Sequence, residues 1–144
     1  MPASSLLWTV GALALSAHLA PAAATPYQLV QSFEGGRFFD GFDFYTGPDP
    51  THGYVQYVDQ ATALSSGLAQ ITPNGSVYLG VDSQTTLDPT SAGRSSVRVQ
   101  SKQTYSQGLF VADILHMPDS VCGVWPAFWT VGNNWPAGGE IGRF

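Results

Sequence analysis

Short apolar runs separated by turn-forming residues are the dominant pattern along this chain. The runs are rich in Val, Tyr, Phe and Ile, and Gly, Pro, Asn or Asp interrupts them every few residues. This alternation is typical of β-strands joined by tight turns. The predicted strands are Tyr27–Phe33, Phe42–Tyr45, Tyr54–Val58, Gly67–Ile71, Val77–Val81, Ser96–Ser101, Leu109–Leu115 and Ala127–Val131.

The segments between the predicted strands carry turn chemistry. Pro73-Asn74-Gly75 separates two strands, and an Asn-Gly pair favours the tight turn of a β-hairpin. Longer loops are expected at 46–53 and 87–93, which are rich in Pro, Asp and Gly. No internal repeat and no amphipathic helix of useful length is evident. The pattern predicts one all-β domain, a sandwich or jelly roll.

The first residues read as a targeting segment. Leu6–Leu19 is an interrupted apolar run, and small residues follow it with an Ala22-x-Ala24 spacing. Such a run is too broken for a membrane span of about 20 apolar residues, whereas the small residues are typical of a secretory cleavage site. We predict that residues 1–24 are a signal peptide and that the mature chain is secreted and extracellular. An uncleaved anchor is the alternative.

The charge balance argues against several partners. The chain has 5 basic and 10 acidic residues, a net charge of −5, without a basic patch. Nucleic acid is therefore not expected as a partner, because phosphate binding requires clustered Lys and Arg. His52 and His116 are not spaced as a metal-binding pair, so we expect no metal and no other cofactor. No membrane partner is expected after cleavage of the leader.

Two further residues bear on secretion. Asn74-Gly75-Ser76 is an acceptor triplet for N-glycosylation, which fits secretion but also occurs often by chance. Cys122 is the one cysteine, and an odd cysteine in a secreted protein indicates a missing partner or a free thiol.

Aromatic side chains gather ahead of a carboxylate at the end of the sequence. Trp125, Trp129 and Trp135 precede Glu140. A flat indole suits the apolar face of a sugar ring, and a neighbouring carboxylate can attack a glycosidic bond. Trp129 lies in a predicted strand, where core packing is the favoured interpretation. Trp135 lies in a loop, which favours a place in the site.

Several segments, taken together and in order, resemble a known family. They are Phe38–Phe44, Asp49–Val55, Gly93–Arg98, Phe110–Pro118, Cys122–Trp129 and Asn134–Ile141. This set is similar to fungal glycoside hydrolase family 16 enzymes of the endo-1,3(4)-β-glucanase, or laminarinase, type. The resemblance implies a β-sandwich jelly roll, concanavalin/laminarinase-like, and hydrolysis of β-1,3(4)-glucan with retention. It also implies that Trp125 and Trp135 line sugar subsites.

The family's catalytic signature is Glu-Ile-Asp-Ile-Glu, with an extra residue before the last Glu in fungal laminarinases. The first Glu is the nucleophile, the Asp assists, and the last Glu is the general acid/base. Alternate residues of a strand point to one face, so this spacing places three carboxyl groups over the substrate. Glu140 matches the nucleophile, Gly142 stands at the Asp position, and the acid/base would fall at Phe144 or one position later.

This departure from the signature leads to three expectations. Residues 25–144 should be the N-terminal part of a family 16 catalytic domain, truncated just after the nucleophile, so that its jelly roll is incomplete. Complete catalytic domains of the family are about twice as long. We expect this chain to be catalytically inactive and, if it folds, monomeric. The alternative is a non-catalytic fragment that binds β-glucan polysaccharide or oligosaccharide through its tryptophans.

Two arginines are further candidates for substrate binding. Arg94 and Arg98 are four residues apart, so on one strand they would share a face, with Val97 and Val99 on the other. Either could hydrogen-bond sugar hydroxyls from that face. A solvated sheet face is the equally favoured alternative.

Overall fold

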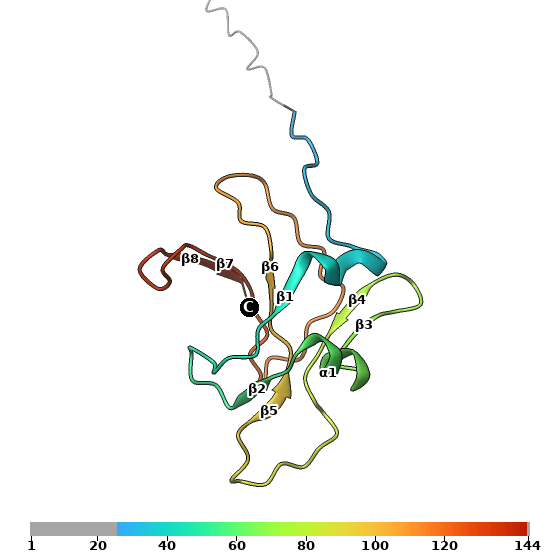
Figure 1. The fold of residues 1–144 in the computed structure, drawn as a ribbon, viewed down its shortest axis with the longest axis vertical. Coiled ribbons are helices and arrows are strands. Elements are labelled where there is room, and N and C mark those ends of the chain that lie inside the picture. The colour runs from blue at the N-terminus through green and yellow to red at the C-terminus, as the bar shows by residue number, and fades with distance from the viewer. Residues whose placement is uncertain (1–25, 144) are drawn as a thin grey trace, which may run out of the picture. The chain divides into compact units, whose positions relative to one another are not determined.

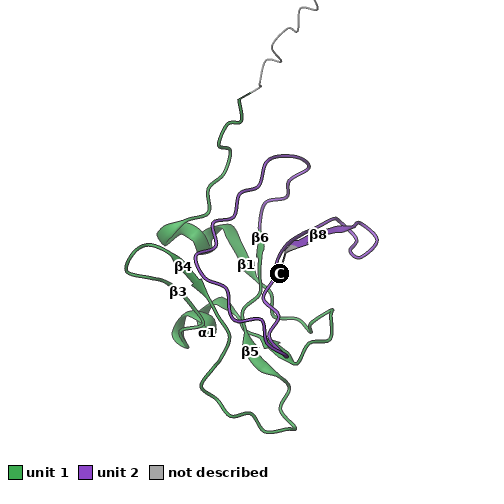
Figure 2. Ribbon diagram, turned by 180° about the vertical axis from the view of Figure 1, so that it is seen from behind, with its two compact units in different colours: residues 1–101 green, residues 102–144 purple. Residues whose placement is uncertain are grey.

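The computed structural model describes residues 26–143, which fall into two compact units (Figures 1 and 2). Unit 1 contains the described residues up to Ser101, and unit 2 begins at Lys102. The predicted signal peptide and the predicted acid/base position at Phe144 lie outside the described residues.

Unit 1 is built from short strands that associate in pairs (Figure 1). The strands β1 and β6 are antiparallel, β2 and β5 are parallel, and β3 and β4 form an antiparallel hairpin. A 3-10 helix, η1, leads directly into β1, and a short helix, α1, leads toward β3. The bounds are η1 Gly35–Gly41, β1 Phe42–Phe44, β2 Val55–Tyr57, α1 Gln60–Ser65, β3 Ala69–Ile71, β4 Val77–Leu79, β5 Arg94–Ser96 and β6 Val99–Ser101.

The predicted hairpin turn is confirmed. Residues 73–75 join β3 to β4, and Ile71 pairs with Val77 at the last rung. The Gly75 N–H donates to the Thr72 carbonyl at 2.9 Å, and Gly75 has a φ of 88°. This left-handed conformation is one that glycine adopts at no steric cost, which is why Asn-Gly is suited to the turn.

The helix α1 was not expected from the sequence. Asp59 caps its first turn, since its carboxylate accepts the Thr62 N–H at 2.7 Å. Beyond the helix the Leu68 N–H donates to Ala63 O at 2.8 Å, and Gly67 adopts a φ of 74°. These contacts form a Schellman end, so the strand predicted from Gly67 begins only at Ala69.

The buried core of unit 1 is small. Phe39 of η1, Ala63 of α1, Leu68 and Ala69 form its centre. The apolar residues packed against this cluster come from elements far apart in the sequence: Phe38, Phe44, Val58, Ile71, Val77 and Val97. Burial of these side chains therefore holds η1, α1 and the strand pairs of unit 1 in place.

Three predicted strands differ in the structure. Tyr27–Phe33 and Leu109–Leu115 are irregular, and Val111 in the second is 84% exposed. Apolar composition alone does not make a strand, because a strand also requires a partner for its backbone N–H and C=O groups. The predicted strand Ser96–Ser101 is divided, since Ser96 ends β5 and Val99 begins β6.

Unit 2 contains one strand pair. The strands β7 (Phe128–Val131) and β8 (Glu140–Arg143) are antiparallel, and the first confirms the prediction for Ala127–Val131. The segment 102–127 that precedes them has no regular secondary structure. Within residues 26–143, none of the helices is long and apolar enough to cross a membrane.

The end of α1 yields a test of the fold. Gly67→Ala should lower the free energy of unfolding by about 1–2 kcal/mol, because a Cβ is strained in the left-handed conformation. Gly36→Ala is the matched control, since Gly36 has no such φ and its added Cβ would meet open space. Urea titration measures both variants. Equal effects of the two substitutions would contradict the Schellman end.

Candidate active site

The register of β7 and β8 places Glu140 on an aromatic face. Glu140 pairs with Val131, and Gly142 pairs with Trp129. Paired residues of antiparallel strands point to the same side, and residues two apart along a strand share a face. Glu140 therefore lies on the same face of the hairpin as Trp129, whereas Ile141 points to the other face.

A hydrogen bond holds the carboxylate of Glu140. The Trp135 Nε1–H donates to Glu140 Oε2 at 2.8 Å. The ring of Trp135 also meets the ring of Trp129 edge to face, with centroids 6.0 Å apart and an interplanar angle of 83°. A bond to a charged acceptor is stronger than one between neutral groups, so the indole fixes the orientation of this carboxylate. The structure thus brings together two predicted site residues, Glu140 and Trp135.

The loop between β7 and β8 depends on glycine to bring Trp135 back over the hairpin. The Gly132 N–H donates to Gly139 O at 2.9 Å, and the Gly138 N–H donates to Asn134 O at 3.1 Å. A Cβ at Gly138 would collide with the Asn133 carbonyl oxygen, and Gly139 has a φ of 83°. Larger residues at these positions would open the loop and carry the indole away from Glu140.

Trp129 is a site candidate that sequence reasoning missed. It was interpreted as core, but its side chain is only half-buried and lies outside the buried cluster of the described residues. It contacts Trp135 on the face that carries Glu140. The two-residue alternation of the strand predicts that Trp129 and Val131 share a face. Which other residues lie on that face could be assigned only once the partner strand and its register were known.

Trp125 lies in the irregular segment ahead of β7. Its side chain is 80% exposed, and it borders an open depression of about 370 Å³. The depression has the size of a small-ligand pocket, and an exposed indole at its edge is suited to contact a sugar ring. Its lining does not include Glu140, and consists of Met117, Pro118, Asp119, Ser120, Val124, Trp125 and Pro126.

The face that carries Glu140 lacks a second acidic side chain on β8. Gly142 shares this face and has no side chain to contribute. Asp113 and Asp119 of unit 2 are exposed and lie in the irregular segment. Among residues 26–143, no group of three or more His, Cys, Asp and Glu side chains is arranged to hold a metal ion.

Arg98 lies in unit 1 between β5 and β6, packed among aromatic and acidic groups. Its guanidinium stands over the ring of Tyr45 at 4.7 Å and that of Tyr57 at 5.8 Å. Its Nη1 lies 3.8 Å from Asp49 Oδ1, and the side chains of Arg98 and Asp49 are 19% and 6% exposed. This is a partly buried ion pair combined with cation–π contacts.

The pKa values of Asp49 and Tyr57 are shifted in opposite directions by this environment. Burial tends to raise the pKa of Asp49, but hydrogen bonds from Thr51 and Gly53 and the charge of Arg98 outweigh it, so that pKa lies below its usual value of 3.8. Burial, and then the charge of Asp49, raise the pKa of Tyr57 above its usual value. The ionised carboxylate is therefore the form that the fold stabilises.

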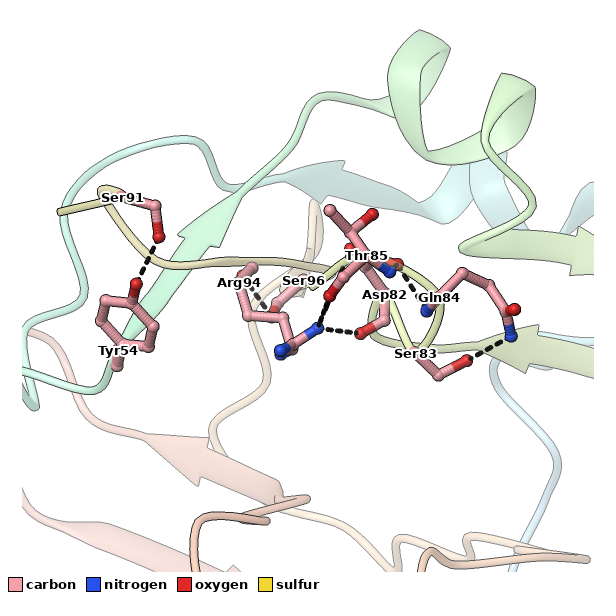
Figure 3. A network of polar contacts seen from close by, with 8 residues as sticks. All are labelled: Tyr54, Asp82, Ser83, Gln84, Thr85, Ser91, Arg94 and Ser96. Carbon is pink, nitrogen blue, oxygen red and sulfur yellow. Dashed lines mark hydrogen bonds and ion pairs between the residues drawn. The ribbon is translucent and has the colours of Figure 1, made fainter. Parts of the chain in front are cut away.

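Arg94 contacts a different segment of unit 1, the loop that contains Asp82 and Thr85 (Figure 3). Its Nη1 donates to the carbonyl oxygens of Asp82 and Thr85, each at 3.0 Å, and lies 3.9 Å from Asp82 Oδ2. Asp82 Oδ1 in turn accepts the backbone N–H groups of Gln84 and Thr85. Arg94 thus ties the loop that follows β4 to β5.

The prediction that the two arginines share a face of one strand is wrong. Arg94 begins β5, whereas Arg98 follows its end, and each has its own set of partners. The physical reason is a change of strand partner, because β5 pairs with β2 whereas β6 pairs with β1, and Arg98 lies where the chain passes from one pair to the other. Whether either arginine binds sugar stays a prediction.

The Asp49 contacts predict a pH dependence. Because the pKa of Asp49 is depressed in the folded chain, its stabilisation is present above pH 3.8 and is lost as the pH falls below that value. Asp49→Asn should lower the free energy of unfolding by about 1–2 kcal/mol at neutral pH, and less below pH 3.8. Urea titrations at both pH values measure this, with the exposed Asp43→Asn as control. A pH-independent difference would refute the assignment.

The bond between Trp135 and Glu140 predicts a spectroscopic change. Glu140→Gln should move the indole N–H resonance of Trp135 upfield, because a neutral amide oxygen is a weaker acceptor than a carboxylate. Nuclear magnetic resonance of the nitrogen-15-labelled chain measures this shift, and Trp135→Phe assigns the signal by removing it. The Trp125 resonance is the internal control. A Trp135 signal that moves no more than the Trp125 signal would contradict the bond.

Comparison with known proteins identifies the family. Residues 42–144, which span both units, match the family described as XgeA-like, catalytic GH16 domain. An Aspergillus niger protein named as a probable endo-1,3(4)-beta-glucanase is 54% identical over 141 residues. The match covers 98% of this chain and 19% of that relative, so the chain spans about a fifth of the relative's length.

Solved structures show the same relationship. A GH family 16 β-1,3-glucosyltransferase described as elongating is 52% identical with a TM-score of 0.73, over 76% of this chain and 37% of that one. Laminarinase 16A from Phanerochaete chrysosporium, with β-glucans in its donor and acceptor sites, is 43% identical with a TM-score of 0.67, over 76% and 36%. These likenesses confirm the predicted fold class, an incomplete all-β jelly roll. The chain belongs to glycoside hydrolase family 16.

Proposed function

We propose that this chain is the part of a secreted β-1,3(4)-glucan hydrolase that carries the nucleophile, Glu140. The observation that carries the proposal is the carboxylate held by the Trp135 indole on the aromatic face of β8. The family match and the names of the glucanase relatives support the substrate class. Secretion rests on the predicted leader, residues 1–24.

The proposed chemistry is a double displacement with retention. The Glu140 carboxylate attacks the anomeric carbon of the sugar, the glycosidic C–O bond breaks, and the leaving oxygen takes a proton from a second acid. Water then attacks the resulting glycosyl ester, loses a proton to that second group, and releases Glu140. Since the Trp135 N–H binds Oε2, the indole leaves Oε1 of Glu140 as the attacking oxygen.

Aromatic rings are the proposed sugar contacts. Trp135 and Trp129 line the face beside Glu140, and Trp125 presents an exposed ring at the edge of its depression. Indole rings bind the C–H faces of sugars with little loss of conformational entropy. Arg94 and Arg98 already make contacts within unit 1, so the tryptophans are the preferred candidates for sugar contact.

The 144-residue chain by itself is proposed to be inactive. Retaining hydrolysis requires two carboxyl groups about 5–5.5 Å apart, one to attack and one to protonate the leaving oxygen. Glu140 supplies the first, and Gly142 supplies no side chain to its face. Binding of β-glucan without cleavage is the alternative for the chain alone, and the exposed ring of Trp125 favours it.

Transfer is a second candidate activity for the complete catalytic domain. The solved neighbour at 52% identity is described as an elongating β-1,3-glucosyltransferase. Hydrolysis and transfer share the glycosyl ester, and they differ only in whether water or a sugar hydroxyl attacks it. The same nucleophile therefore serves both reactions, and the products distinguish them.

A pair of proteins tests the proposal. The first is the chain alone, and the second is a chimera in which residues 42–141 replace the matching segment in the catalytic domain of the Aspergillus niger relative. The chimera should release reducing sugar from laminarin, and Glu140→Ala should lower its kcat/KM at least about a thousandfold. The chain alone should release no more than its own Glu140→Ala variant.

A second chimera, with the junction after Gly142, isolates the effect of that glycine. It should be less active than the chimera that carries residues 42–141. Proton resonances of the first products should show a retained anomeric configuration, and longer oligosaccharides would assign transfer.

If the chimera that carries residues 42–141 is inactive but melts cooperatively, the proposed hydrolase function is refuted. Hydrolysis by the chain alone would refute its proposed inactivity. Retention of the chain on insoluble β-glucan, lost in Trp125→Ala, would support binding without cleavage.

A further inference from the structure

The hairpin of β3 and β4 carries at its tip an acceptor triplet for N-glycosylation, which plays no part in the proposed function. Asn74-Gly75-Ser76 is the one Asn-x-Ser/Thr triplet in the sequence, and its middle residue is not proline. Residues 73–75 are all exposed. In Figure 1 the loop that joins β3 to β4 extends away from the other labelled elements of unit 1. A bulky group at this tip would project into solvent.

The side-chain hydrogen bonds of Asn74 involve its amide oxygen, Oδ1, as the acceptor. Asn74 Oδ1 accepts the hydroxyl of Thr72 at 2.5 Å and the Ser76 N–H at 3.2 Å. The Thr72 N–H donates to Ser76 O at 2.8 Å and closes the same turn. Because these bonds use Oδ1, replacing one hydrogen on Nδ2 leaves all of them in place.

The turn also offers room beside the acceptor. A Cβ at Gly75 would meet nothing within 4 Å, and its φ of 88° turns the chain at the tip. The buried residues of the hairpin lie at the opposite end, at Leu68 and Ala69. Asn74 itself is exposed, so a glycan attached to it covers none of the four residues at the centre of the buried cluster.

We propose that Asn74 is N-glycosylated, a modification that rests on the proposed secretion of the chain. The Nδ2 of Asn74 attacks the first sugar carbon of a lipid-diphosphate-linked oligosaccharide. The N–C bond forms, the C–O bond to the diphosphate breaks, and the lipid diphosphate leaves with the bonding electrons. Nδ2 loses one proton to a base of the transferring enzyme, so no oxidant or reductant is needed.

Expression of the full chain in a yeast secretory host tests the proposal. One series keeps residues 1–24, and a parallel series replaces them with a leader already proven in that host. Removal of N-glycans by a peptide-N-glycosidase should increase gel mobility and convert Asn74 to aspartate, which tandem mass spectrometry locates. Asn74→Gln and Ser76→Ala should abolish the shift, and Ser76→Thr should retain it, because the threonine hydroxyl completes the same triplet.

The two series separate the outcomes. Absence of glycan on the chain that carries the proven leader overturns the assignment of Asn74, as does a shift that persists in Asn74→Gln. Glycan with the proven leader but none with residues 1–24 supports the acceptor site and refutes the proposed secretion. Glycan in both series, lost in Ser76→Ala and kept in Ser76→Thr, supports both.

Discussion

The pairing register of β7 and β8 decides which side chains surround Glu140. Because strand side chains alternate, a shift by one residue would turn Glu140 to the opposite face of the hairpin, away from Trp129. The glycine-dependent loop of residues 132–139 fixes this register and returns Trp135 to the same face. One backbone arrangement thus orients a carboxylate and gathers two indole rings beside it.

Unit 1 has a small buried centre, and polar contacts hold its loops. Arg94 ties the loop after β4 to β5, and Arg98 joins Asp49 to two tyrosine rings. These contacts bring together residues that are far apart in the sequence, as the parallel pairing of β2 and β5 also does. Removing one partner of such a contact leaves the other polar group partly buried and unpaired, which costs more than the loss of an exposed ion pair.

Much of the strand pattern could be predicted from local sequence, whereas short capped elements could not. The strands near Phe42–Tyr45, Tyr54–Val58 and Val77–Val81 follow the apolar alternation, and the Asn-Gly turn was identified correctly. Helix α1 was not predicted, because its only sequence signals are one capping residue, Asp59, and one glycine, Gly67, at the ends of a six-residue helix. The strand predicted at Leu109–Leu115 is not observed, because this segment pairs with no strand within residues 26–143.

The sequence by itself determined the family, the strand-rich fold class and the place of Glu140 next to an aromatic segment. Those properties depend on residue identity and order, which are local. Tertiary structure decided that Trp129 shares the face of Glu140, that Trp135 donates a hydrogen bond to Glu140, and that Arg94 and Arg98 contact separate segments. The reason is physical, because the facing of a strand residue and the partners of a charged group are fixed only when a second segment pairs with the first.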